Sequence, residues 1–84
     1  MNPYKVCDKI IEYLIKDGYR YQIHQRDLEK AIMVVRGVID ERSIKRWIKA
    51  LETFGYIERK TAKVYELTRY ALSLSHSQIL NKQT

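Results

Sequence analysis

The stretch RSIKRWIKALETFGYIER, residues 42–59, combines a two-faced helix with the start of a strand. At 100° per residue, four cationic side chains fall within about 60° of one line along the helix; these are Arg42, Lys45, Arg46 and Lys49. The opposite side is apolar and consists of Ile44, Trp47, Ile48, Leu51 and Phe54. Such a helix packs through its apolar side. Its cationic side either meets an anionic partner or is solvated, as many charged helix faces are.

Residues on both sides of this stretch set the boundaries of the helix. Asp40 predicts the helix start, because an Asp side chain accepts a hydrogen bond from the free N–H groups of the first turn, and Gly55 predicts its end. Residues 56–60 and 64–67 have the composition of two strands around a polar, basic tip, which is typical of a hairpin. We therefore expect a helix over about residues 41–54 and a hairpin over about residues 56–67.

Two further helices and a short strand are predicted upstream. Asn2 and Pro3 favour a first helix that ends near Gly18, because Asn caps free amides and Pro loses nothing at the first helical position. Apolar and polar residues alternate over positions 19–24, which indicates a short, half-buried strand. A second helix is expected from about residue 24 or 25 to residue 36 or 37, where a glycine interrupts the apolar pattern.

The C-terminal segment is compatible with two interpretations. Thr68 is a suitable cap for a helix that continues to about Leu80, whereas residues 72–77 alternate as a strand would. We expect the helix. Residues 81–84 should fray at its end.

The first helix has more apolar surface than one core contact needs. Its main stripe consists of Val6, Ile10, Tyr13 and Leu14. A second stripe runs beside it and consists of Tyr4, Cys7, Ile11 and Ile15. This second stripe must meet either the chain's own C-terminal segment or another subunit. We expect another subunit, because a core this small leaves a thin stability margin, and the second stripe is therefore the predicted interface of a homodimer.

Length and charge bound the class of protein. A chain of 84 residues holds one small domain, which we place over residues 1–80. Its net charge of +6 favours an anionic partner such as nucleic acid. The longest aliphatic run, residues 31–35, is far shorter than the roughly 18 residues that predict a membrane span, and it is too short for a signal-peptide core. We therefore expect a soluble, cytoplasmic protein that has no contact with a membrane.

Motifs for catalysis and for cofactor binding are missing from the sequence. The three glycines stand far apart, so no glycine-rich phosphate loop exists. Cys7 is the single cysteine and forms neither an internal disulfide nor a CxxC pair. His24 and His76 are far apart and belong to no HExxH motif, and no GxSxG motif is present. The sequence therefore predicts no enzyme, no metal site and no cofactor.

The order of helix, short strand, helix, helix and basic-tipped hairpin, with RSIKRWIKALETFGYIER across the third helix and the next strand, closely resembles the winged helix-turn-helix family of DNA-binding domains. The resemblance covers about residues 4–68. It implies an α+β winged-helix fold, in which a three-helix bundle carries a short strand and a two-stranded wing, with the C-terminal helix added. Composition rich in Ile, Lys and Tyr is also similar to that of small winged helices from archaea and from archaeal viruses and plasmids.

The resemblance implies which residues touch DNA. In that family the third helix enters the major groove, and the wing lies over the backbone or the minor groove. The corresponding positions on the third helix are Arg42, Ser43, Lys45, Arg46 and Lys49. The positions on or beside the wing are Arg59, Lys60 and Lys63. Gln25 and Arg26 stand at the start of the second helix, where free amides and a side chain can hold a phosphate.

The expected function is that of a double-stranded DNA-binding protein and transcriptional regulator. Charge supports it, because residues 36–69 contain nine Lys or Arg against five acidic residues, whereas residues 1–35 contain six against five. One alternative is a winged helix that serves as a protein-interaction module in replication or transcription machinery. A ligand-sensing regulator is a third possibility, ranked lower because the sequence has no added segment that would form a pocket.

Overall fold

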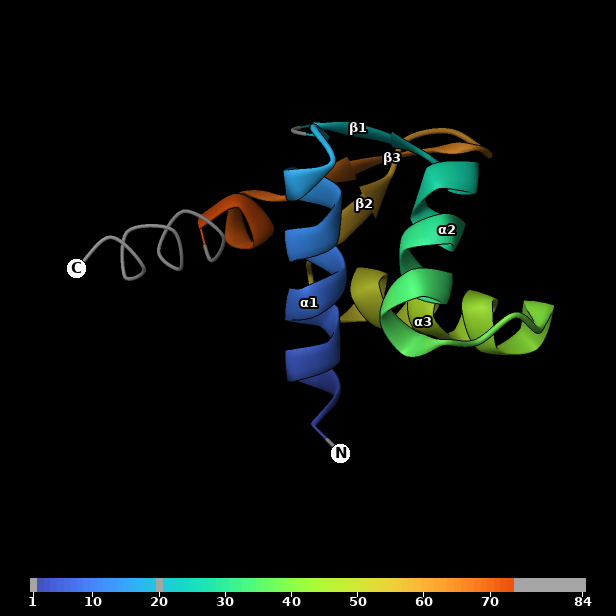
Figure 1. The fold of residues 1–84 in the computed structure, drawn as a ribbon. Helices are drawn as coiled ribbons and strands as arrows, with labels where there is room; N and C mark the ends of the chain where they lie inside the picture. Colours follow the sequence, from blue (N-terminus) through green and yellow to red (C-terminus); the bar gives the residue numbers. More distant parts are fainter. Residues whose placement is uncertain (1, 20, 74–84) are drawn as a thin grey trace.

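The computed structural model describes residues 2–19 and 21–73, which form an α+β fold of helices and one small antiparallel sheet (Figure 1). The elements in chain order are α1 (Pro3–Lys16), β1 (Gln22–His24), α2 (Gln25–Arg36), α3 (Glu41–Thr53), β2 (Ile57–Arg59) and β3 (Val64–Leu67). Residues 69–73 are also helical. This order of elements is the one expected from the sequence, and the arrangement is compatible with that of a winged helix.

The helix ends follow from their caps, as predicted. The side chain of Asn2 accepts a hydrogen bond from the backbone N–H of Tyr4, and the Asp40 carboxylate accepts one from the N–H of Ser43 over 2.9 Å. Gly37 ends α2 with φ at 68°, a left-handed conformation that glycine adopts without steric cost. α2 is therefore a full three turns long, and the connection to α3 consists of residues 37–40.

The sheet has the strand order β1-β3-β2, so that the last strand lies in the middle. Ile23 and Arg59 both face Tyr65 across their antiparallel ladders. The predicted half-buried strand over positions 19–24 is shorter than expected, because only residues 22–24 pair in the ladder and Tyr21 is 67% exposed. The carbonyl of Tyr21 nevertheless accepts a hydrogen bond from the N–H of Leu67, which extends the contact between the two segments.

The core lies where α1, α2 and α3 meet the sheet. In Figure 1, α1 and α2 stand beside each other, α3 runs across the lower end of α2 at the height of the lower half of α1, and the sheet lies at the upper ends of both helices. The largest fully buried side chains are Tyr56, Ile10, Leu14, Ile23, Leu28, Ile32 and Leu51. The Tyr56 hydroxyl donates to the Asp8 carboxylate over 2.7 Å. Burial, followed by this hydrogen bond, raises the pKa of Tyr56 above its usual value.

The second apolar stripe of α1 is covered within the chain. We predicted a dimer interface made of Tyr4, Cys7, Ile11 and Ile15. This prediction is wrong for Cys7 and Ile11. Cys7 is 0% exposed and Ile11 only 3%, so neither offers surface to a second subunit. Both belong to one buried cluster with Ala71, and Ile15 packs against that cluster. Tyr4 is half-exposed and stacks on Phe54, with ring centroids 4.6 Å apart. The C-terminal segment, the other candidate to cover this stripe, returns to contribute Ala71 to the core.

Thr68 opens the C-terminal helical segment, as predicted. Its hydroxyl oxygen accepts a hydrogen bond from the N–H of Ala71 over 3.3 Å and donates to the backbone carbonyl of Gly55. The prediction of a helix is confirmed over residues 69–73. Its continuation to Leu80 and the fraying of residues 81–84 lie outside the described residues. Within residues 2–19 and 21–73, no helix has both the length and the apolar character needed to cross a membrane.

Candidate nucleic-acid interface

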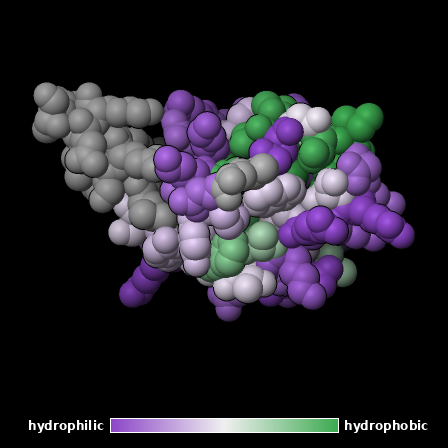
Figure 2. All heavy atoms as spheres, turned by 90° about the horizontal axis from the view of Figure 1, so that it is seen from below, coloured by the Kyte–Doolittle hydropathy of each residue, from purple (hydrophilic) through white to green (hydrophobic). Residues whose placement is uncertain are grey.

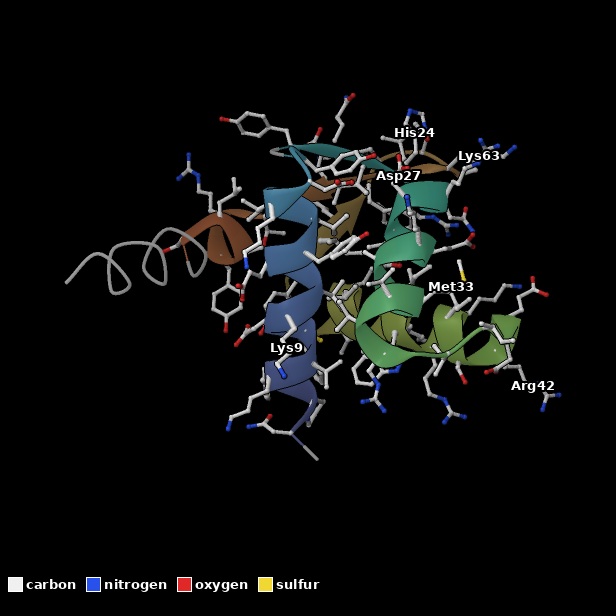
Figure 3. All side chains as sticks on the ribbon, viewed as in Figure 1. Lys9, His24, Asp27, Met33, Arg42 and Lys63 are labelled. Atoms are coloured by element: carbon white, nitrogen blue, oxygen red, sulfur yellow. The ribbon has the colours of Figure 1, made fainter. Side chains whose placement is uncertain are left out.

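The exposed side of α3 carries a row of cations that we call the cationic ridge: Arg42, Lys45, Arg46 and Lys49. All four side chains are exposed, because Ile44, Ile48 and Leu51 hold the other side of the helix in the core. In Figure 3 the Arg42 side chain points away from the body of the molecule at the N-terminal end of α3. The helix therefore separates its charges from its packing contacts, as the sequence predicted.

Not all members of the ridge are equally available to a partner. Lys45 pairs with Glu41, one turn earlier, over 3.2 Å, and both side chains are exposed. Such a surface pair contributes little to stability, but it offsets part of the positive charge of Lys45. Within the described ranges, Arg42, Arg46 and Lys49 form no ion pair. These three residues therefore carry the uncompensated charge of the ridge.

Ser43 lies on the flank of α3, next to the ridge. It is half-buried, and its backbone N–H donates to the Asp40 carboxylate, which accepts from the Ser43 hydroxyl as well. These hydrogen bonds hold the pKa of Asp40 below its ordinary value. The polar groups of Ser43 are thus used in capping α3, and Ser43 is less exposed than the four cations of the ridge.

The hairpin β2–β3 presents the three predicted wing residues, Arg59, Lys60 and Lys63, all of them exposed. Lys60 lies 3.4 Å from the Glu58 carboxylate and 3.9 Å from that of Glu66, which stand opposite each other on paired strands. Two carboxylates therefore offset the charge of Lys60. Lys63 forms no ion pair within the described part of the chain, so it keeps its full charge.

Arg59 is held against the hairpin itself. Its guanidinium lies 5.8 Å from the ring centroid of Tyr65, a cation–π contact, and donates to the carbonyl of Ala62 over 3.4 Å. The aromatic ring fixes the direction of the side chain, yet leaves it exposed. Arg59 can therefore still meet an anion, from a position that the hairpin sets in advance.

The start of α2 meets the hairpin tip. The backbone N–H of Gln25 donates to the Lys63 carbonyl over 2.8 Å, and the Gln25 side chain donates to Glu29 over 3.2 Å. The first amide of α2 is therefore already used, which corrects the expectation that it is free for a phosphate. Arg26 is exposed at this helix start and lines, with Lys63, a hollow of about 610 Å³.

Sequence reasoning missed three residues of this hollow, namely His24, Asp27 and Glu29. His24 precedes α2 and makes no capping hydrogen bond with its side chain; the sequence pattern marks it only as a helix boundary. Asp27 accepts a hydrogen bond from the Tyr19 hydroxyl, which raises the pKa of that tyrosine. The carboxylates make this hollow mixed in charge, a property that depends on side chains brought together by the fold.

Figure 3 labels one or more residues of each of the three regions. In the view of Figure 3, Lys63 and His24 project from the upper right and Arg42 from the lower right, away from α1. In this view the labelled residues of the hairpin tip, of the start of α2 and of the N-terminal end of α3 all lie on the side of α1 where α2 stands. Within residues 2–19 and 21–73, no group of three or more His, Cys, Asp or Glu side chains is placed to hold a metal ion.

Comparisons with known proteins give no relatives. No protein-family model matches the chain, and searches of curated proteins and of solved structures return no significant match.

Proposed function

We propose that this protein is a winged-helix protein that binds double-stranded DNA and regulates transcription. The observation that carries the proposal is the cationic ridge, in which Arg42, Arg46 and Lys49 are exposed and form no ion pair among the described residues. Phosphate attraction supplies most non-specific affinity for DNA. A ridge of free cations on the outer side of a rigid helix provides that attraction in a defined geometry.

In the proposed complex α3 lies in the major groove, which is wide enough to admit a helix. Arg42 and Arg46 are the candidates for guanine contacts, because a guanidinium can donate two hydrogen bonds to the O6 and N7 atoms of guanine. Lys49 lies further along the same line and suits a phosphate contact. Ser43 has a smaller role than the resemblance implied, since its N–H and hydroxyl cap the helix.

The hairpin acts as the wing in this proposal. Lys63 and Arg59 would contact the backbone or the minor groove, while Arg26 at the start of α2 would contact a phosphate. The hydrogen bond from Gln25 to Lys63 supports a joint role, because it ties the wing tip to the start of α2. Lys60 contributes less, because Glu58 and Glu66 offset its charge.

A charge-reversal experiment with a matched control tests the proposal. The double variant Arg42→Glu/Arg46→Glu should abolish binding to random duplex DNA in a gel shift and leave thermal unfolding nearly unchanged. The control Lys5→Glu/Lys9→Glu changes the net charge equally on exposed positions of α1, where Figure 3 shows Lys9 pointing away from α3. It should retain most of the binding. Equal loss in both variants, or retained binding in the first, would refute the proposed interface.

A protein-interaction module is the second candidate, and exposed apolar residues favour it. Val34 is 56% exposed and Ile39 is 87% exposed, at the end of α2 and in the connection to α3. Figure 2, which views the molecule from below, shows the most hydrophobic side chains in the upper part of that face and a smaller, paler group near its centre, both beside hydrophilic ones. A protein-docking module would bind DNA only weakly and without sequence preference, so a selection of bound duplexes from a random pool separates the two functions.

Homodimerisation belongs to the proposal only in a changed form. The pairing of two copies cannot use Cys7 or Ile11, which are buried within the chain. It must use side chains that remain exposed, such as Ile39 or Tyr70. Sedimentation of the wild type measures whether pairing occurs, and sedimentation of Ile39→Glu and Tyr70→Glu locates the surface.

A further inference from the structure

A second hollow, of about 400 Å³, runs along the flank of α3 and is separate from the one at the hairpin. The end of α2 and the start of α1 complete its walls. It brings two guanidinium groups, those of Arg36 and Arg46, together with the apolar side chains of Val38, Trp47 and Phe54. Its volume falls in the range of about 300–1,000 Å³ that is usual for small-molecule sites.

Arg36 is the unusual residue of this hollow. Its guanidinium carbon lies 5.3 Å from the ring centroid of Trp47, a cation–π contact that fixes its position. Its Nε atom is buried, and no acceptor within the described part of the chain bonds to it. Folded proteins rarely leave a buried N–H donor unpaired, because desolvation of the donor is then not compensated. Since Nε itself is closed to solvent, a ligand in the hollow would meet the outer nitrogens of the guanidinium.

We propose that this hollow binds a small organic anion, that is, a carboxylate or phosphate group on a flat apolar body. The anionic group would accept hydrogen bonds from Arg36 and Arg46, since a guanidinium donates in a fork that matches carboxylate and phosphate oxygens. The flat body would pack on the parts of the Trp47 and Phe54 rings that Arg36 and Tyr4 leave uncovered, since aromatic rings supply rigid apolar surface.

Charge distinguishes this hollow from the one at the hairpin. The hairpin hollow is lined by two carboxylates, Asp27 and Glu29, which offset the charges of its two cations, Arg26 and Lys63. None of the described residues that line the α3 hollow is acidic, and two of them are arginines. The attraction for an anion is therefore not offset from within the α3 hollow, and its apolar walls exclude part of the water that would screen that attraction.

Occupation of this hollow would also affect the cationic ridge. Arg46 belongs to both, because it lines the hollow and is exposed on the outer side of α3. An anion that engages Arg46 would remove it from DNA contact and lower DNA affinity. This regulatory consequence rests on the proposed function, whereas binding of the anion does not.

Binding can be measured without DNA, because Trp47 is the single tryptophan and gives one indole N–H signal in a ¹H–¹⁵N spectrum. Benzoate is the probe, and benzamide is its neutral counterpart of nearly equal shape. Benzoate should shift the Trp47 indole signal saturably. Benzamide should bind about tenfold more weakly or worse, because it cannot form charge-assisted hydrogen bonds with the arginines.

Two variants and one control locate the site. Arg36→Gln and Arg46→Gln should each weaken benzoate binding about tenfold, and Arg46 is exposed, so its replacement does not threaten the fold. Arg42→Gln removes the same charge from α3 outside the hollow and should leave benzoate binding unchanged. Thermal unfolding of each variant verifies that it is folded.

Three results would overturn the proposal. The first is benzamide binding as tightly as benzoate, which would make the hollow a plain apolar pocket. The second is an equal loss of benzoate affinity in Arg46→Gln and Arg42→Gln, which would show that benzoate responds only to the net charge of the protein. The third is a saturable shift with inorganic phosphate or duplex DNA but none with benzoate, which would assign the hollow to a phosphate of DNA. Loss of DNA binding in other experiments would leave these outcomes unaffected.

Discussion

The backbone N–H of Gln25 donates a hydrogen bond to the backbone carbonyl of Lys63 over 2.8 Å. This contact joins the first residue of α2 to the tip of the hairpin β2–β3. The first N–H groups of a helix have no acceptor within the helix, so the hairpin supplies one. Two of the three parts of the proposed DNA interface are thereby held in fixed relation.

Replacing Gln25 with proline should remove this tether and leave α2 intact. Proline is well tolerated at the first helical position, and His24 already has the extended conformation (φ −71°, ψ 146°) that a residue before proline prefers. We expect a loss of about 1 kcal/mol in the free energy of unfolding. DNA affinity should fall several-fold, and amide hydrogen exchange at Lys60 and Thr61 should become faster.

The control for this prediction is Gln25→Ala. It keeps the backbone N–H and removes only the side-chain hydrogen bond to Glu29. Hydrogen exchange at the hairpin tip should then stay close to that of the wild type. Faster exchange in both variants would show that the side chain, rather than the backbone contact, holds the hairpin.

The cations of the hairpin should differ in their contribution to DNA binding. Lys63→Gln should lower the slope of log affinity against log salt by about 1, as expected for the loss of one phosphate contact. Lys60→Gln should change the slope much less, because Glu58 and Glu66 already offset its charge. Fluorescence anisotropy at several salt concentrations measures both slopes. Equal changes of the slope in the two variants would contradict the prediction that Lys63 contributes more to DNA binding than Lys60.

Ile11→Glu should unfold the single chain instead of separating a dimer. Ile11 is 3% exposed, and a carboxylate in that position would lose both its hydration and the packing of the isoleucine. We expect a destabilisation of about 3 kcal/mol or more, measured by thermal unfolding. Ile39→Glu is the matched control, since Ile39 is 87% exposed and its replacement should leave the unfolding temperature nearly unchanged.

Cys7 should be unreactive in the folded protein. Burial, with a smaller contribution from the charge of Asp8, raises the pKa of its thiol to about 11. Thiol reagents should therefore react slowly at pH 8 and become fast only in denaturant. Fast labelling of the native protein at pH 8 would contradict the burial of this side chain.

The same shift in pKa makes stability depend on pH. The folded state keeps its thiol proton, while the unfolded state loses it above the ordinary cysteine pKa of 9.0. The contribution of Cys7 is therefore fully present below pH 9 and is lost as the pH rises towards 11. Denaturant unfolding of the wild type and of Cys7→Ala between pH 8 and pH 11 measures this contribution by difference, since the variant lacks the thiol.

Features that depend on neighbours in the sequence were predictable. Asp40 caps α3 because its carboxylate reaches an N–H three residues away, and Gly37 ends α2 through its own backbone conformation. The two sides of α3 follow from helical periodicity alone, so the exposure of Arg42, Arg46 and Lys49 was predicted as well. Each of these features needs only one element of the chain.

Features that depend on contacts between distant elements were not predictable. The stripe with Cys7 and Ile11 is buried inside the chain, in the same cluster as Ala71, and periodicity cannot say which surface covers another. Lys60 meets Glu66 only because the register of β2 and β3 places their strands side by side. Tyr21 lies one residue before the ladder of β1 and is exposed, whereas Ile23 within the ladder is buried.

The sequence by itself therefore determined the order of the elements, the ends of the helices α1, α2 and α3 and the cationic side of α3, since hydrogen bonds within a turn and helical period are local properties. Only the tertiary structure decided which cations keep their charge, which apolar side chains stay exposed, and that Arg36 and Arg46 share one hollow with Trp47. These three features require side chains from different elements to meet in space. Whether they meet depends on how the whole chain packs, which no local pattern in the sequence specifies.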